Sequence, residues 1–294
     1  MATRPEHSAP PEIFYGETEA VKYTASTRVT SIQAEMTERA LEIMNLPGPS
    51  FLLDIGCGSG LSGEILDENE HIWVGLDISS AMLDVALERE SEGDLFLQDI
   101  GQGMAFRPGS FDGAVSISVI QWLCNADATT HEPRARLKRF FTTLYMALRR
   151  GARAVFQFYP EGPHQIDLIT TAAHRAGFTG GVVVDYPNSS KARKYYLCLF
   201  AGSENVPLPA ARTDPLADGM DVDGAPAAVG AGQVRHVERG RQRVLKGKGR
   251  AKGLTTAKTR RERILHKKAL SRLRGKEGIP LDSKRTGKKR KDRF

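Results

Sequence analysis

A segment of helical periodicity at residues 26–46 is followed, up to residue 200, by short apolar segments that alternate with further helical segments. A run such as Phe51–Ile55 is apolar at nearly every position, which is typical of a strand buried on both faces of a parallel sheet. Between such runs, apolar residues recur every three or four positions, as they do along one face of a helix. The pattern predicts strands at 51–55, 72–77, 95–97, 111–118, 154–159, 182–184 and 195–200, and helices at 26–46, 79–89, 134–149 and 164–176, with a further helix ending near 67.

Strands that alternate with helices predict an α/β domain with a mainly parallel sheet and helices on both faces. The last two strands are separated only by the turn-rich segment 187–190, so we expect them to form an antiparallel hairpin at the sheet edge. Ser79 is the predicted N-cap of its helix, and Gly151 is the predicted C-cap after the helix at 134–149. Residues 1–12 are polar and Pro-rich, and we expect them to be disordered.

The charge of the chain is divided unevenly along its length. Residues 231–294 contain 24 Lys and Arg but 5 Asp and Glu, a net charge of +19, whereas residues 1–230 have a net charge of −12. This predicts a folded body at 13–202, a disordered linker at 203–233 and a Lys/Arg-rich tail at 234–294. Such a tail favours a polyanionic partner such as RNA, or serves as a nuclear import signal.

Several classes of protein are disfavoured by the sequence. No apolar run approaches the ~18 residues of a transmembrane helix, and residues 1–12 lack the apolar stretch of a secretory signal. The three cysteines are scattered without a CxxC pair, and the seven histidines never have ligand spacing, so we expect no disulfide framework and no metal site. We therefore expect a protein of a reducing intracellular compartment that does not enter membranes.

A glycine-rich segment, D-I-G-C-G-S-G at residues 54–60, connects the first predicted strand to a helix. Glycine allows unusual φ values and a close approach of the backbone to a ligand. The segment lacks the Gly-Lys-Ser/Thr ending of a P-loop. A dinucleotide motif, GxGxxG, also fits residues 58–63, but the carboxylate of Asp54 would repel a pyrophosphate. It suits a cationic, amine-bearing ligand, and S-adenosylmethionine carries both a sulfonium and an amino group.

Two further aspartates end the next strands. Asp77 could accept hydrogen bonds from both ribose hydroxyls, and Asp99 could accept the adenine amine while Ile100 packs on the ring. Asp54, Asp77 and Asp99 together form the pattern of a class I methyltransferase. The predicted cofactor-binding residues are Asp54, Gly56, Gly58, Ser59, Gly60, Asp77, Ile78, Asp99, Ile100 and Ser116.

Beyond these motifs, four longer stretches are specific: QAEMTERALEIM at 33–44, SISVIQWL at 116–123, FQFYPE at 156–161 and GFTGGVVVDYPNSSKARKYYLCL at 177–199. Through them, residues 10–202 resemble the eukaryotic small-subunit (18S) rRNA (guanine-N7) methyltransferase family, and the tail ending in KKRKDRF is also similar. It implies methylation of N7 of a guanine in small-subunit rRNA, a role in small-subunit biogenesis, and a location in the nucleus and nucleolus, with the cytoplasm as a further site. It also implies a heterodimer with a small zinc-binding activator protein.

Methylation of guanine N7 needs no general base, because this nitrogen has a lone pair and no proton. We therefore assign no catalytic acid or base, and expect the protein to act by positioning and electrostatics. An extruded guanine needs a stacking surface and hydrogen bonds to its edge. The candidate substrate-binding residues are Tyr15, Tyr23, Arg28, Trp122, Phe158 and Tyr159.

Two other functions fit the sequence. The first is a methyltransferase for a protein or small molecule, with the tail serving only nuclear import. The second is a ribosome-assembly factor whose binding matters more than its catalysis.

Overall fold

A seven-stranded sheet forms the centre of the protein. The computed structural model describes residues 4–129, 131–189, 191–202 and 206–213, together with Leu265 and Lys268. Its strands are β1 (Phe51–Ile55), β2 (Ile72–Asp77), β3 (Asp94–Leu97), β4 (Phe111–Ile117), β5 (Leu148–Phe158), β6 (Phe178–Asp185) and β7 (Lys194–Ala201). They lie in the order β3-β2-β1-β4-β5-β7-β6, and β7 runs antiparallel to both of its neighbours. The predicted mainly parallel sheet with an antiparallel C-terminal hairpin is therefore confirmed.

Local sequence signals determine where the helices begin and end. The Ser79 hydroxyl accepts a hydrogen bond from a backbone N–H in the first turn of α5 (Ser80–Glu88), as predicted for an N-cap. Ser26 caps α3 (Thr27–Met44) in the same way. This helix ends at Asn45, which adopts the left-handed conformation with φ 48°.

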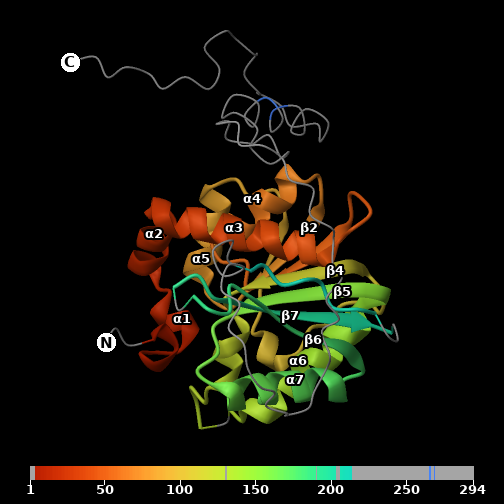
Figure 1. Cartoon of the computed structure of the whole chain (residues 1–294). Helices are drawn as coiled ribbons and strands as arrows, with labels where there is room; N and C mark the ends of the chain where they lie inside the picture. The colour runs from red at the N-terminus through yellow and green to blue at the C-terminus, as the bar shows by residue number, and fades with distance from the viewer. Residues whose placement is uncertain are drawn as a thin grey trace, which may run out of the picture. The chain divides into compact units, whose positions relative to one another are not determined.

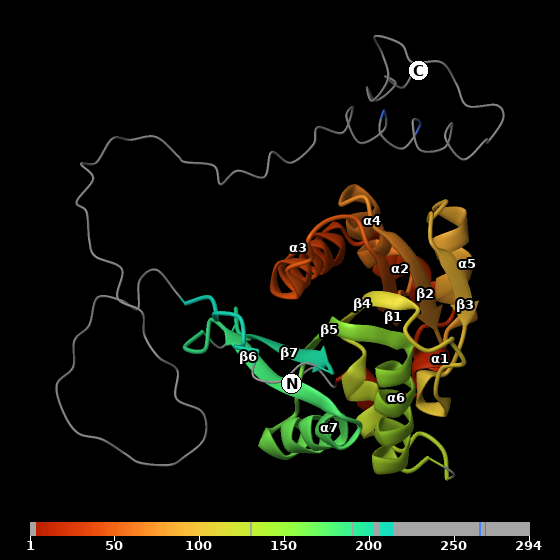
Figure 2. The same cartoon turned by 90° about the vertical axis from the view of Figure 1, so that its right-hand side faces the viewer.

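Helices cover both faces of the sheet (Figures 1 and 2), as predicted. Helices α3, α4 (Leu61–Glu68) and α5 lie on one face, and α6 (Pro133–Ala147) and α7 (Pro163–Arg175) lie on the other. Each face buries its own apolar cluster, with Met36 of α3 in one and Phe140 of α6 in the other.

The order of the strands creates a crevice at one edge of the sheet. Strand β1 pairs with β2 on one side and with β4 on the other, all in parallel. After β1, the chain first adds β2 and β3 on one side of β1. It then crosses to the other side of β1 and adds β4 there. Ligands of open α/β sheets bind at the carboxyl ends of the strands at such a point.

The N-terminal segment is ordered from Arg4 onward, so the prediction of disorder over 1–12 is wrong for residues 4–12. The guanidinium of Arg4 donates hydrogen bonds to the carbonyls of Tyr159 and Pro160 at 2.9 and 3.0 Å. These bonds tie the segment to the end of β5. A one-turn helix, α1 (Pro11–Phe14), and the longer α2 (Glu17–Ala25) follow; neither is visible as a periodic pattern in the sequence.

The predicted helix at 134–149 ends earlier, at Ala147, and passes directly into β5 at Leu148. Gly151 has φ 84° and lies within β5, where the pairing with β4 is irregular, so it is not a helix C-cap. Leu148 and Ala152 are both buried, and their burial in the sheet outweighs continuation of the helix.

Residues 206–213, predicted as linker, are attached to the body and are called the strap below. The backbone N–H of Arg212 donates to Asp185 at 2.7 Å, and its carbonyl accepts from the N–H of Tyr186 at 2.7 Å. Arg39 donates to the carbonyl of Ala210 at 2.9 Å. The folded body therefore extends beyond the predicted boundary at 202. The predicted linker at 214–233 and nearly all of the tail lie outside the described residues.

Candidate cofactor and substrate site

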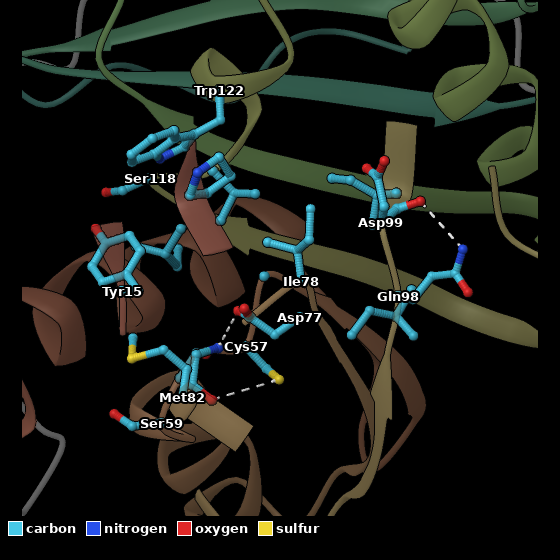
Figure 3. Close-up of a pocket in the computed structure, with 18 of the residues that line it drawn as sticks. Tyr15, Cys57, Ser59, Asp77, Ile78, Met82, Gln98, Asp99, Ser118 and Trp122 are labelled. Atoms are coloured by element: carbon cyan, nitrogen blue, oxygen red, sulfur yellow. Dashed lines mark hydrogen bonds between the residues drawn. The ribbon is translucent and has the colours of Figure 1, made fainter. Parts of the chain in front are cut away.

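A pocket opens at the carboxyl edge of the sheet, beside the glycine turn (Figure 3). Its empty space is about 950 Å³, counting the part that is open to solvent. The turn after β1, the ends of β2 and β4, and parts of α1, α2 and α6 line it. The predicted site residues among its walls are Tyr15, Tyr23, Gly56, Gly58, Ser59, Asp77, Ile78, Asp99, Ile100 and Trp122.

The turn after β1 depends on glycine at three alternate positions. Gly56, Gly58 and Gly60 have φ values of 73°, 54° and 77°, in the left-handed region that disfavours other residues. A Cβ atom at Gly56 would also lie 2.2 Å from a methyl group of Val119. The backbone of the turn is held to β2, because the N–H groups of Gly56 and Cys57 both donate to the Leu76 carbonyl.

Asp77 ends β2 with its carboxylate in the pocket. One oxygen accepts a hydrogen bond from the N–H of Gly58 and the other accepts from the N–H of Ser79, each at 2.8 Å. These bonds fix the carboxylate between the glycine turn and α5, with acceptor capacity left on both oxygens for a ligand. Burial raises the pKa of Asp77, and the backbone hydrogen bonds oppose this effect.

Asp54 lies behind the pocket wall and is completely buried. The Ser62 hydroxyl, which does line the pocket, donates to one carboxylate oxygen at 2.6 Å. The other oxygen is buried without a hydrogen-bond partner in the described part of the chain. Burial raises the pKa of Asp54 to about 7, although the Ser62 hydrogen bond lowers it. Asp54 therefore does not line the pocket itself, and the Ser62 hydroxyl links it to the pocket wall.

This raised pKa predicts that the stability of the protein falls as pH rises from about 4 to about 7. In that range the folded state keeps the Asp54 proton that the unfolded chain has lost, so unfolding releases it. The contribution is about 1.4 kcal/mol of unfolding free energy per pH unit. Urea unfolding at several pH values should show this slope in the wild type, and Asp54→Asn should show a flatter one. A difference between the two proteins that does not change with pH would contradict the assignment.

Asp99 is already paired in the structure. The guanidinium of Arg136 donates to both of its carboxylate oxygens, at 2.9 and 3.0 Å, and the N–H of Gly101 donates to one of them at 2.9 Å. Arg136 lies 37 positions from Asp99 in the sequence, so this pairing has no local sequence signal. Ile100 is buried and lines the pocket beside it.

Aromatic rings form the wall opposite Asp99 (Figure 3). The Tyr15 ring centroid lies 5.9 Å from that of Trp122 and 5.7 Å from that of Tyr23. Burial raises the pKa of Tyr15 to about 12 and raises that of Tyr23 as well, so both phenols are neutral at physiological pH. Neutral phenols can stack on a base and also donate hydrogen bonds to it.

Two hydrogen bonds attach α1 and α2 to the cofactor half of the site. The Ser79 hydroxyl donates to the Tyr15 carbonyl at 2.7 Å, and the Thr24 hydroxyl donates to that of Ser59 at 2.7 Å. The N-terminal helices thus form part of the pocket wall.

Other predicted site residues lie away from the pocket. Arg28 is exposed on α3. Ser116 is buried and donates to the Ile55 carbonyl, and Phe158 is buried in the core. Tyr159 accepts a hydrogen bond from Lys194, whose ammonium also lies over its ring. Gly60 begins α4 and is likewise absent from the pocket walls.

The structure adds residues that the sequence analysis missed, among them Gln33, Met82, Ser118 and Arg136. Ser118 has φ 64°, which is unusual for serine. Its hydroxyl donates to the Gln157 side chain at 2.7 Å. The signal for Ser118 was its position directly after β4, at the carboxyl edge; Arg136 had no local signal.

Within the described residues, no group of three or more potential ligands could hold a metal ion. The same residues include no helix that is long and apolar enough to cross a membrane.

Comparison with known proteins shows similarity along the whole chain. A family model described as "Methyltransferase domain" matches residues 53–156, and one described as "Methyltransferase involved in Williams-Beuren syndrome" matches residues 199–292. The 18S rRNA (guanine-N(7))-methyltransferase of Mus musculus is 53% identical, over 99% of this chain and 98% of its own. The 18S rRNA (guanine(1575)-N(7))-methyltransferase of Saccharomyces cerevisiae is 51% identical, over 99% of this chain and 100% of its own.

Among solved structures, phosphoethanolamine N-methyltransferase 2 of Haemonchus contortus, in complex with S-adenosylhomocysteine, has a TM-score of 0.50. It is 17% identical and covers 64% of this chain and 58% of its own. This similarity confirms the predicted class I methyltransferase fold.

Proposed function

The chain belongs to the family of 18S rRNA (guanine-N7)-methyltransferases, and from this premise we propose that it methylates N7 of a guanine in small-subunit rRNA during small-subunit biogenesis. The observation that carries the proposal is the combination of about 50% identity over nearly the full chain with a pocket in which Asp77 faces an aromatic wall. Enzymes of this family are S-adenosylmethionine-dependent methyltransferases.

The residues of the pocket fit this cofactor. Gly56 lets the turn adopt φ 73° while its backbone packs against Val119, so the turn lies against the pocket without a side chain. The Asp77 oxygens, each already oriented by one backbone N–H, can accept the two ribose hydroxyls. Ser62, which lines the pocket, donates a hydrogen bond to the buried carboxyl group of Asp54. S-adenosylmethionine supplies an electrophilic methyl group when it is bound.

The protein's own contribution is positioning. Tyr15, Tyr23 and Trp122 offer ring faces and two phenol donors to a guanine. Helices α1 and α2, attached through Ser79 and Ser59, hold Tyr15 and Tyr23 in the pocket wall. Guanine N7 carries no proton, so no residue needs to remove one.

The experiment that tests the proposal is mapping of N7-methylguanine in 18S rRNA from cells with the wild-type protein, without it, and with Gly58→Arg. The arginine must adopt φ 54° and its Cβ would lie 3.0 Å from Met82, so it obstructs the cofactor site. We expect the modification to be lost in both altered strains. Modification that persists without the protein would contradict the proposal. Normal growth of the Gly58→Arg strain beside a defective deletion strain would show that binding is the more important role.

We further propose that the tail at 234–294 takes the enzyme to the nucleus and nucleolus and contacts rRNA. The proposal is supported by the net charge of +19 over residues 231–294, which favours contact with phosphates.

We also propose that a small zinc-binding activator protein pairs with β3. This strand is at the sheet edge, and Phe96 and Leu97 on it are 50% and 63% exposed. An apolar edge strand invites the addition of a strand from a partner. Leu87 on the adjacent α5 is also largely exposed and widens the apolar surface.

Leu97→Lys is expected to weaken activator binding by about tenfold or more, because a charge would replace apolar surface buried on binding. Calorimetry should measure the loss. Met146→Lys, a similarly exposed apolar position on α6, is the control that should bind normally. In the wild type, hydrogen exchange of residues 94–98 should slow when the activator is added. Equal exchange with and without it would place the partner elsewhere.

A further inference from the structure

An arginine is buried in the pocket wall at the end of β3. Arg136 extends from α6 and is 7% exposed. Its two terminal nitrogens donate to the two carboxylate oxygens of Asp99. This bidentate arrangement fixes the plane of the carboxylate as well as its position.

The hydrogen bonds leave Asp99 with one defined free acceptor position. Its Oδ1 accepts from Arg136 and from the N–H of Gly101, which uses both lone pairs of that oxygen. Its Oδ2 accepts from Arg136 alone in the described structure. The remaining lone pair of Oδ2 can accept an N–H donor, and it repels a carbonyl oxygen at the same place.

Other contacts hold the guanidinium in its orientation. A Cβ atom at Gly101 would lie 2.4 to 2.6 Å from the guanidinium atoms, so the group packs directly against a residue without a side chain. Nη1 also lies 3.1 Å from a ring nitrogen of His131. The Nε of Arg136 is buried without a hydrogen-bond partner among the described residues. A buried donor without an acceptor is costly. The bonds to Asp99 nevertheless keep the guanidinium in the orientation that leaves Nε unpaired.

We propose that Arg136 is a positioning residue that makes Asp99 a receptor for the exocyclic amine of the cofactor's purine, and so makes the enzyme discriminate a 6-amino from a 6-oxo purine. The inference rests on the proposed S-adenosylmethionine site. Lysine cannot replace the arginine, because a single ammonium cannot hold both oxygens in one plane.

The test compares the binding of S-adenosylhomocysteine with that of its deaminated analogue, in which a carbonyl replaces the 6-amino group. Calorimetry on the full chain should show that the wild type prefers the amine form by about tenfold or more, since the analogue loses a charge-assisted hydrogen bond and meets an unpaired acceptor. Arg136→Lys and Arg136→Gln should lose most of this preference, mainly through weaker binding of the amine form. Arg139→Gln, an exposed neighbour on the same helix, should retain the wild-type preference.

Gly101→Ala provides a second variant if the Arg136 variants do not fold. It retains both charges and displaces the guanidinium through the added methyl group, so it should reduce the preference in the same way. An equal loss of affinity for both ligands would show that Arg136 only supports the fold, and would overturn the inference. A wild type without any preference would also overturn it. A wild type that binds neither ligand would instead contradict the proposed cofactor site.

Discussion

Asp77→Ala is expected to weaken S-adenosylmethionine binding by at least about tenfold and to reduce methylation at subsaturating cofactor accordingly. The variant would lack the carboxylate that we propose accepts both ribose hydroxyls, and charge-assisted bonds of this type contribute roughly 1.5–3 kcal/mol each. The same change removes the acceptors that hold the N–H groups of Gly58 and Ser79, so the glycine turn would lose a support as well. Calorimetric titration of the purified variant measures the effect.

The variant should remain folded, because burial disfavours the Asp77 carboxylate and its removal relieves that cost. Asp84→Ala, an exposed position on the neighbouring α5, is the matched control and should bind the cofactor normally. An unchanged dissociation constant for Asp77→Ala would remove this residue from the site.

Removing residues 234–294 is expected to weaken binding to an 18S rRNA fragment by about 100-fold or more at low salt and to flatten its salt dependence. If about six of the tail's cations contact phosphates, the slope of log affinity against log salt should decrease in magnitude by about 4 to 5. Sequence preference should change little, because phosphate contacts carry no base information. Binding of both proteins to the same RNA across a salt series decides the matter.

The truncated protein should bind S-adenosylmethionine like the full chain, because the glycine turn and Asp77 lie in the body. The cut at 233 also preserves the strap, whose Arg212 is bonded to Asp185. A cut at 202 would remove both the strap and the tail, so the loss of the strap's contacts with the body could not be separated from the loss of the tail's cations. Identical salt slopes for the full and truncated chains would favour a tail that serves nuclear import alone.

The sequence predicted those features that depend on neighbouring residues. The strand boundaries at 51–55 and 72–77, the Ser79 cap and the glycine turn each follow from local periodicity or local backbone requirements, and the structure reproduces them. Asp77 lines the pocket, as its position at the carboxyl end of a parallel strand leads one to expect, and its contact with the ribose stays a prediction.

The features that were missed depend on partners distant in the sequence. Asp99 is paired with a residue 37 positions away on a helix across the pocket, and no local pattern identifies which arginine will reach it. The strap has no periodicity, since backbone groups bonded to Asp185 and Arg39 hold it in place. Arg28 and Phe158 were chosen for their residue type near the predicted site, but one side chain is exposed on α3 and the other is in the core.

The position of β7 has a consequence for the synthesis of the protein. This strand comes last among the described strands, yet it lies between β5 and β6, and β6 has no other partner among them. The nascent chain therefore cannot add β6 to the sheet until residues 194–201 have left the ribosome. The end of β7 at Ala201 is translated 16 residues after the end of β6 at Asp185, so β6 waits roughly 1–3 s for its partner at ~5–20 residues per second. A chain that terminates within β7 would leave β6 without its partner and β5 with an open edge, which would favour aggregation.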